Sequence, residues 1–192
     1  MRLLCFGDSN TYGYDPRSYF GGRYDAQNRW VDLLAQKTGW ELFNAGQNGR
    51  EIPRRSREFT QIQQLLALSG PVDAFLVMLG DNDLLQGASV ETVLARMEAF
   101  LSQLPSVCGK IILIAPPPLK CGTWVPATQL HEDVLQLAEH YQTLAHRLGI
   151  EFIDTRDWNL ELTFDGVHFS EADHILFAEH LFAALSHMNL SD

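Results

Sequence analysis

Four polar residues whose side chains could take part in catalysis each follow a short apolar run or sit on a loop beside one: Ser9, Asn82, Asp165 and His168. A serine hydroxyl is a poor nucleophile at neutral pH and needs a neighbouring base to take its proton. Histidine suits that task because its pKa lies near neutrality, and a carboxylate fixes the tautomer of the ring and stabilises the imidazolium. Together these residue types form the inventory of a serine-nucleophile hydrolase.

The spacing of these residues adds to the prediction. Asp165 and His168 are separated by Gly166 and Val167, so that a tight turn at the glycine can place both side chains together. A developing oxyanion needs preorganised donors, each contributing ~3 kcal/mol. The candidates are the backbone amide of Ser9, a backbone amide of the loop 44–50, and the side-chain amide of Asn82.

Each residue also has an ordinary structural interpretation. A serine after a strand often caps a turn or helix, and Asp165-Gly166 is a common turn signal. Asn82 could close an Asx turn, and His168 could lie on the surface. The catalytic interpretation is favoured because all four residues occur together at successive strand ends.

Two other chemistries fit less well. A phosphate-binding loop would need a G-x-G-x-x-G or G-x-x-x-x-G-K-[ST] pattern, which is absent after the first apolar run, and Asp8 there would oppose a phosphate. A nucleophile elbow of the α/β-hydrolase type needs glycine two residues after the serine, where Thr11 stands.

Short apolar runs alternate with amphipathic segments along the chain. Strands are expected over residues 3–6, 41–44, 74–79, 110–115 and 151–153, and helices over residues 29–38, 56–68, 90–104, 129–148 and 171–187. Ser89 and Ser170 are good N-caps, and Gly149 suits a helix C-terminus.

Five β-then-α repeats with nearly continuous apolar strands predict a five-stranded parallel sheet covered on both faces. The expected fold is an α/β class, three-layer α/β/α sandwich with flavodoxin-like connectivity, in one domain over residues 1–192. In such folds ligands gather at the carboxyl ends of the strands, where Ser9 and Asn82 are expected.

Composition and charge exclude several classes of function. The chain of 192 residues is 46% hydrophobic and 20% charged, which is typical of a globular protein. Its formal net charge of −10, with no basic run longer than Arg54-Arg55, argues against nucleic acid or an anionic membrane as a partner. Cys5, Cys108 and Cys121 form no CxxC motif, so reduced, mostly buried thiols are expected rather than a metal site. The first apolar run is too short for a signal sequence or a membrane span, which favours a cytoplasmic location.

Over nearly its whole length the sequence resembles the SGNH (GDSL-type) hydrolases, with four motifs in the family order. Gly7-Asp8-Ser9 looks like the nucleophile block, the loop 44–49 like the glycine block, Gly80-Asp81-Asn82-Asp83 like the GxND block, and Asp165-Gly166-Val167-His168 like the DxxH block. The resemblance implies that Ser9 is the nucleophile, His168 the base and Asp165 its partner.

The same resemblance implies an oxyanion hole made by the backbone N–H groups of Ser9 and Gly49 and the amide of Asn82. Gly46 is the alternative glycine, because the loop alignment can slip by three residues. No metal or organic cofactor is implied.

Within the family, the sequence is most similar to the small arylesterase/acyltransferase branch, through residues 4–9, 29–30, 78–80 and 115–118. This implies cleavage of short acyl esters, with possible acyl transfer to alcohols, and substrate contacts from Tyr14, Leu85 and Val167. Asn10 stands where the family has leucine, which bears on substrate preference.

Several alternatives stay open. The fold and the triad do not choose among acyl donors, so that an acetylated sugar, a thioester or a lysophospholipid is also an admissible substrate. A catalytically silent binding domain is the alternative from another class. Members of the branch can assemble around the active site, and the aromatic segment with Tyr12, Tyr14, Tyr19, Phe20 and Tyr24 is a candidate subunit contact, a rim over the site or a plain surface loop. Trp124 has the same status.

Overall fold

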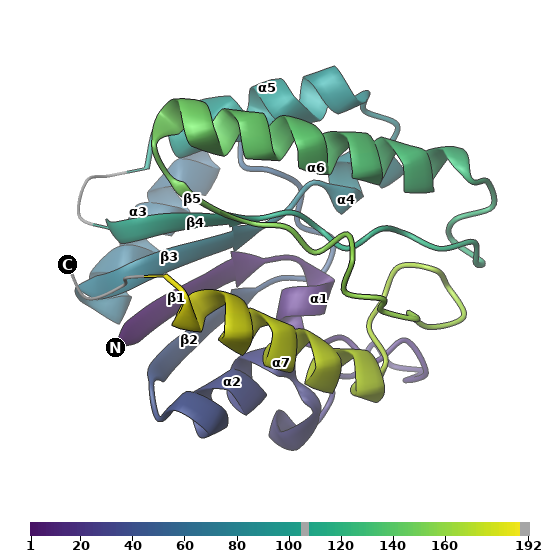
Figure 1. Ribbon diagram of the computed structural model, residues 1–192, viewed down its shortest axis with the longest axis horizontal. Helices are drawn as coiled ribbons and strands as arrows, with labels where there is room; N and C mark the ends of the chain where they lie inside the picture. The colour runs from purple at the N-terminus through teal and green to yellow at the C-terminus, as the bar shows by residue number, and fades with distance from the viewer. Residues whose placement is uncertain (105–107, 189–192) are drawn as a thin grey trace.

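The computed structural model describes residues 1–104 and 108–188. Its centre is a five-stranded parallel sheet in the order β2-β1-β3-β4-β5 (Figure 1). The strands are β1 (Arg2–Gly7), β2 (Glu41–Gly46), β3 (Val72–Met78), β4 (Cys108–Ile114) and β5 (Glu151–Ile153). This is the flavodoxin-like strand order, and the predicted fold class is confirmed.

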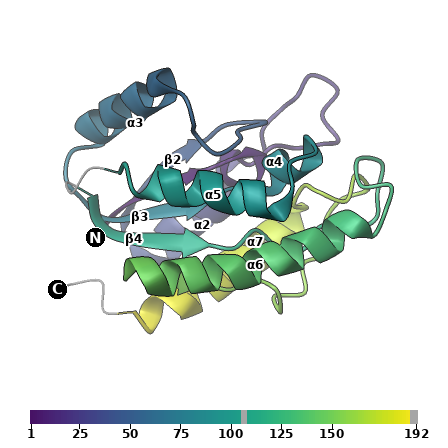
Figure 2. The ribbon, with the colours of Figure 1, turned by 90° about the horizontal axis from the view of Figure 1, so that it is seen from above.

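Helices cover both faces of the sheet and make the three layers (Figures 1 and 2). One face carries α2 (Trp30–Thr38) and α7 (Glu171–Ser186), and the other carries α3 (Ser56–Ser69), α5 (Val90–Leu101) and α6 (Gln129–Leu148). The cap residues act as the sequence predicts: the side chains of Ser89 and Ser170 accept hydrogen bonds from the first turns of their helices, and Gly149 ends α6 with φ 65°. In the part of the chain that the structure describes, none of the helices has the length and apolar character needed to cross a bilayer.

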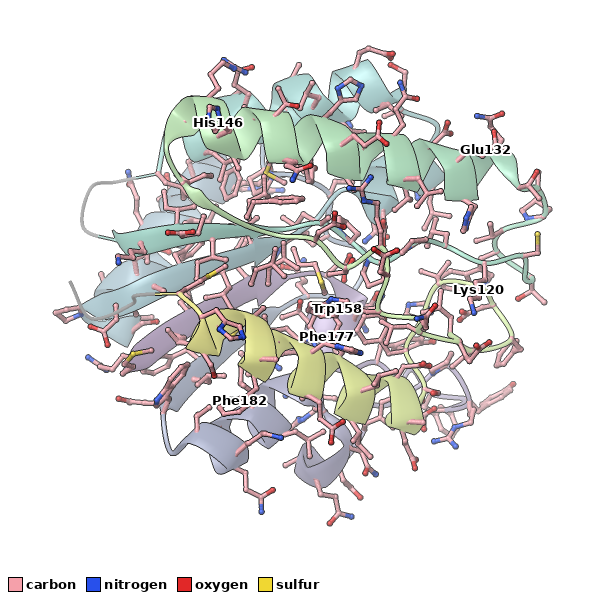
Figure 3. The ribbon with its side chains drawn as sticks, viewed as in Figure 1. Lys120, Glu132, His146, Trp158, Phe177 and Phe182 are labelled. Carbon is pink, nitrogen blue, oxygen red and sulfur yellow. The ribbon has the colours of Figure 1, made fainter. Side chains whose placement is uncertain are left out.

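Alternation along the strands separates two hydrophobic cores. Leu4 and Phe6 of β1 point into the core under α3, α5 and α6, whereas Leu3 and Cys5 point into the core under α2 and α7. In the second core the Trp158 ring packs against Phe177 of α7, with ring centroids 5.0 Å apart (Figure 3). A fully buried leucine or phenylalanine contributes roughly 1.5–3 kcal/mol to stability.

The register of the sheet places the site. Gly7 at the end of β1 lies opposite Gly46 of β2 and Met78 of β3, so three strands end at one level. Two short helices start just beyond these ends, α1 (Ser9–Tyr12) after β1 and α4 (Asp81–Leu85) after β3, and a 3₁₀ helix spans Ala26–Asn28. The apolar pattern predicted neither α1 nor α4, because helices of four and five residues are too short to show a 3.6-residue period.

The cysteines differ in their exposure to solvent. Cys5 is a buried free thiol, as expected, and Cys121 is an exposed free thiol in the loop after β4. The side chain of Cys108 lies outside what the structure describes.

Candidate active site

Ser9 is held at the point where β1 gives way to α1. Asp8 caps this short helix, and its Oδ1 accepts a hydrogen bond of 2.9 Å from the Asn10 N–H. Gly7 is needed just before it, because a Cβ atom there would lie 2.0 Å from Thr11 Oγ1. The Ser9 side chain is nearly buried, with Oγ 3.0 Å from Nε2 of His168.

His168 and Asp165 complete a hydrogen-bonded chain. His168 Nδ1 lies 2.7 Å from Asp165 Oδ2, and Asp165 Oδ1 accepts hydrogen bonds from the N–H groups of Val167 (2.9 Å) and His168 (3.0 Å) and from the Thr163 hydroxyl (2.9 Å). Burial disfavours ionisation of Asp165, but the hydrogen bonds from His168 and Val167 outweigh it and lower the pKa of Asp165 well below its ordinary value. Because an ionised carboxylate only accepts hydrogen bonds, Nδ1 of His168 carries the proton and Nε2 accepts from Ser9.

The loop after β4 clamps the loop that carries this pair. Lys120 N–H donates to Gly166 O and Trp124 N–H donates to Asp165 O, both at 3.0 Å. Gly166 has φ +81°, and a Cβ atom there would lie 2.0 Å from Lys120 O, so both the turn and the close approach require glycine. The tight turn expected at Gly166 is therefore present and is held by a second loop.

Asn10 ties the helix that carries Ser9 to the loop that carries His168. Its buried Nδ2 donates to Val167 O and its Oδ1 accepts from Phe169 N–H, each at 3.0 Å. These are the backbone groups on either side of His168. The side chain of Asn10 thus contacts the base-carrying loop, a role that the sequence analysis missed when it linked this position to substrate preference alone.

Aromatic rings flank His168. The Tyr14 ring lies with its centroid 4.7 Å from the imidazole, and the Trp124 ring, 55% exposed, lies 5.1 Å from it edge-on. Tyr14 therefore borders the site, and its contact with substrate stays a prediction. The other two expected contacts, Leu85 and Val167, pack their side chains against the core under α3, α5 and α6, Val167 being buried and Leu85 half-buried.

The candidate oxyanion donors differ in their partners. The Gly46 N–H already donates to Asn44 Oδ1 at 3.0 Å. Within residues 1–104 and 108–188, the N–H groups of Ser9 and Gly49 meet no acceptor. Asn82 Nδ2 donates to Arg50 O at 3.1 Å and makes only a long 3.5 Å contact with Asp8 Oδ2. This pattern favours Gly49 over Gly46 as a free donor.

Arg50 fixes the turn that carries Gly49, and nothing in the sequence pattern singled it out. Its guanidinium donates to Gly7 O at 2.7 Å and to Ala45 O, at the carboxyl ends of β1 and β2, and lies 4.1 Å from the centre of the Phe6 ring. Burial lowers the pKa of Arg50 to about 10, while Asp8 nearby favours the charged form.

Three further carboxyl groups, those of Asp8, Asp81 and Asp83, lie where β1 and β3 lead into α1 and α4. Asp83 accepts from Ile52 N–H (2.9 Å) and Arg96 (2.6 Å), contacts that hold the loop before α3 and helix α5 in place. Asp81 is buried with Oδ1 lacking a partner among the described residues, and burial, with Asp8 and Asp83, raises its pKa well above the ordinary value. In the described parts of the chain no three His, Cys, Asp or Glu side chains are grouped to hold a metal ion.

The buried Asp8 carboxylate predicts a pH-dependent stability. Burial raises the pKa of Asp8 from 3.8 to about 6, although hydrogen bonding and nearby charges oppose this. A carboxyl whose pKa is higher in the folded than in the unfolded protein destabilises the fold as pH rises from about 4 through about 6. We expect Asp8→Asn, which keeps an oxygen for the Asn10 N–H, to be more stable than the wild type by up to about 3 kcal/mol above pH 7.

This difference should nearly vanish at pH 4, where Asp8 of the folded protein is protonated. Thermal or urea unfolding of both proteins from pH 4 to pH 8 measures it. The exposed Asp157→Asn is the matched control and should show no such trend. An Asp8→Asn protein less stable than the wild type at pH 7.5 would contradict the prediction.

The chain matches a model of the GDSL-like lipase/acylhydrolase family over residues 5–174. Among solved structures, a protein of Agrobacterium tumefaciens str. C58 assigned as an arylesterase is 26% identical, with a TM-score of 0.82 and coverage of 96% of this chain and 98% of that chain. The M. smegmatis aryl esterase is 25% identical, with a TM-score of 0.80 and the same coverage. Est24, a carbohydrate acetylesterase from Sinorhizobium meliloti, is 24% identical, with a TM-score of 0.79 and again 96% and 98% coverage, which shows the shared fold. No curated protein sequence matches the chain.

Proposed function

The chain belongs to the GDSL-like lipase/acylhydrolase family, and from that premise we propose that it is a serine esterase that cleaves short-chain acyl esters through an acyl-enzyme on Ser9. The observation that carries the proposal is the continuous hydrogen-bonded chain from Ser9 Oγ through His168 to Asp165, with distances of 3.0 and 2.7 Å. A purely structural serine would not need a buried, oriented histidine and an ionised carboxylate behind it.

In the first step Ser9 Oγ attacks the ester carbonyl carbon while its proton passes to His168 Nε2. Asp165 stabilises the imidazolium that forms and keeps Nδ1 pointed at its own Oδ2. The tetrahedral oxyanion is held by the N–H groups of Ser9 and Gly49 and by the Asn82 amide. The support for this set is that the first two N–H groups meet no acceptor in the described chain, and that one Asn82 N–H makes only the long contact to Asp8.

In the second step the carbon–oxygen bond to the alcohol breaks, and His168 returns its proton to the leaving oxygen. Water then attacks the acyl carbon on Ser9 while His168 takes its proton. The bond from that carbon to Ser9 Oγ breaks, His168 returns the proton to Oγ, and the carboxylic acid leaves. An alcohol in place of water would give acyl transfer, because the same base deprotonates either nucleophile.

Aromatic side chains shape the entrance in this proposal. The rings of Tyr14 and Trp124 both lie next to the His168 imidazole and offer apolar walls to a small acyl or alcohol group. The tip of the same segment, Tyr19 and Phe20, is 93% and 92% exposed and does not reach the core. The homo-oligomer expected from this segment stays a prediction.

Labelling with a fluorophosphonate tests the mechanism, because an activated serine reacts and an idle one does not. We expect stoichiometric modification of the native protein, located at Ser9 by peptide mass spectrometry, and none after heat denaturation. Hydrolysis of p-nitrophenyl acetate, butyrate and octanoate then gives the chain-length preference, expected to favour the short esters. A native protein that is neither labelled nor active on any of these esters would instead indicate a silent binding domain.

A further inference from the structure

A cavity of about 530 Å³ is lined in part by Gly49, one of the proposed oxyanion donors, and is not used by the mechanism above. It opens between the turn that carries Gly49 and helix α3, which lies at the outer edge of its helix layer, beyond α5 (Figure 2). Its wall is formed by the segment 49–55, by Phe6 and Gln47, and by side chains of the first turns of α3.

The charge of this wall is opposite to that of the protein. The chain has a formal net charge of −10 and only 14 lysine and arginine residues, yet four arginines line this one cavity: Arg50, Arg54, Arg55 and Arg57. The acidic residues of the wall are Glu51 and Glu58. A local excess of positive charge in an acidic protein focuses anions at that place.

The two glutamates are already engaged. Glu51 forms an ion pair of 2.7 Å with Arg54, and Glu58 Oε2 accepts hydrogen bonds of 2.8 Å from the backbone N–H groups of Arg54 and Arg55 at the start of α3. Arg55 and Arg57 form no ion pair with a carboxylate in residues 1–104 and 108–188. Arg55 lies close enough to Glu58 to help lower the pKa of that carboxyl, but in the described chain neither guanidinium is held in a salt bridge, so both are free to pair with a bound anion.

The cavity also has an apolar side and shares one residue, Gly49, with the proposed oxyanion hole. Phe6, Ile52, Ile62 and Leu65 contribute apolar surface to its lining. Gly49 belongs both to this lining and to the proposed oxyanion hole, and the carbonyl oxygen of its neighbour Arg50 accepts from Asn82. Gly49 is therefore the point past which a substrate with its ester carbonyl at Ser9 would extend to reach the cavity.

We propose that this cavity binds a negatively charged group of the ester substrate, a carboxylate carried on a short apolar chain, with Arg55 and Arg57 holding the charge and the apolar lining holding the chain. The inference rests on the proposed esterase function and names the substrate class for it. Guanidinium groups suit this role because their planar fork pairs with both oxygens of a carboxylate.

Matched esters test the proposal on either side of the scissile bond. On the acyl side, the p-nitrophenyl monoester of adipic acid is compared with p-nitrophenyl hexanoate, which has the same six-carbon chain without the charge. On the alcohol side, 4-acetoxyphenylacetate is compared with 4-ethylphenyl acetate. We expect a higher kcat/KM for the anionic ester in one of the two pairs, and the pair that shows it identifies the side that enters the cavity.

The arginine variants show whether the cavity causes the preference. In Arg55→Gln/Arg57→Gln the anionic-to-neutral ratio of kcat/KM should fall by about 10- to 100-fold, with the neutral ester affected less than about 3-fold. Arg147→Gln on α6 replaces an exposed arginine far from this wall in the sequence, and it should leave the ratio nearly unchanged. It removes one positive charge and is therefore the matched control for Arg57→Gln alone, which should already lower the ratio. The wild-type ratio should also fall at 0.5 M salt, because screening weakens exposed ion pairs.

Three results would overturn the inference: no anionic preference in either pair, a preference unchanged in the double variant, or an equal loss in Arg147→Gln. If the double variant does not fold by circular dichroism, Arg57→Gln alone is measured. Titration calorimetry measures the affinity of the protein for adipate without any turnover. This binding should be lost in the arginine variant. If the wild type binds adipate in this way but cleaves no ester, the proposed function is contradicted, whereas the anion-binding site is supported.

Discussion

Replacing Ser9 with alanine is expected to lower kcat for p-nitrophenyl acetate by ~10⁴-fold or more, because it removes the atom that forms the acyl-enzyme. The remaining rate would come from the oxyanion donors and from substrate binding alone. Initial rates at saturating ester give kcat, and fluorophosphonate labelling should disappear in the same variant. The fold should survive, since among the described residues the Ser9 side chain loses just the hydrogen bond of 3.0 Å to His168.

The control for this result is a serine outside the site. Ser186 lies near the end of α7, where its hydroxyl donates to the Phe182 carbonyl on the exposed side of the helix. Ser186→Ala should keep kcat within about 2-fold of the wild type. If Ser9→Ala retained a tenth or more of the wild-type kcat, another group would have to be the nucleophile.

The elements that position this site could be predicted from sequence because they are long and periodic. All five strands and the five long helices lie where the apolar pattern places them, with ends that differ by three residues or fewer. Their order fixes which loops share the carboxyl edge of the sheet, so Ser9 and Asn82 could be assigned to one rim without coordinates. The motif at residues 165–168 then supplied the candidate base, His168, and its carboxylate partner, Asp165.

The positioning residues could not be predicted in this way, for a physical reason. Asn10 binds backbone groups of Val167 and Phe169, which lie 157 and 159 positions away in the chain. Backbone groups are the same at every residue, so the sequence carries no sign of which one a side chain will meet. Arg50 is a similar case, since its partners are the carbonyl groups of Gly7 and Ala45.

The burial of two acidic side chains could not be predicted from the sequence either. Asp8 and Asp81 occur in glycine-containing turns that look solvent-exposed in sequence, yet both are buried at the strand ends. An acidic residue normally avoids such a place unless it is paired. The cost of keeping Asp8 there is what the pH dependence of Asp8→Asn measures.

Replacing Asp165 with asparagine is expected to lower kcat by about 10³- to 10⁴-fold while leaving Ser9 and His168 in place. The amide keeps the size of the carboxylate, but it neither stabilises the imidazolium nor enforces a proton on Nδ1 of His168. With the proton on Nε2 instead, the ring can no longer accept from the Ser9 hydroxyl. Steady-state kinetics should show the loss in kcat, with KM changed much less.

The depressed pKa of Asp165 adds a second readout with a defined sign. A carboxylate whose pKa is lower in the folded protein contributes stability above its ordinary pKa, and this contribution is lost as pH falls toward the folded-state value. Asp165→Asn should therefore be less stable than the wild type at pH 7, and the gap should narrow as the pH is lowered below about 4.

Thr163→Val separates this role from simple support of the loop. It removes the 2.9 Å hydrogen bond to Asp165 Oδ1 but leaves the charge and the contact with His168 intact. We expect it to lower kcat by less than about 10-fold, because the backbone N–H groups of Val167 and His168 still hold the carboxylate. If Thr163→Val and Asp165→Asn lost activity equally, the loop geometry, rather than the negative charge behind His168, would control the base.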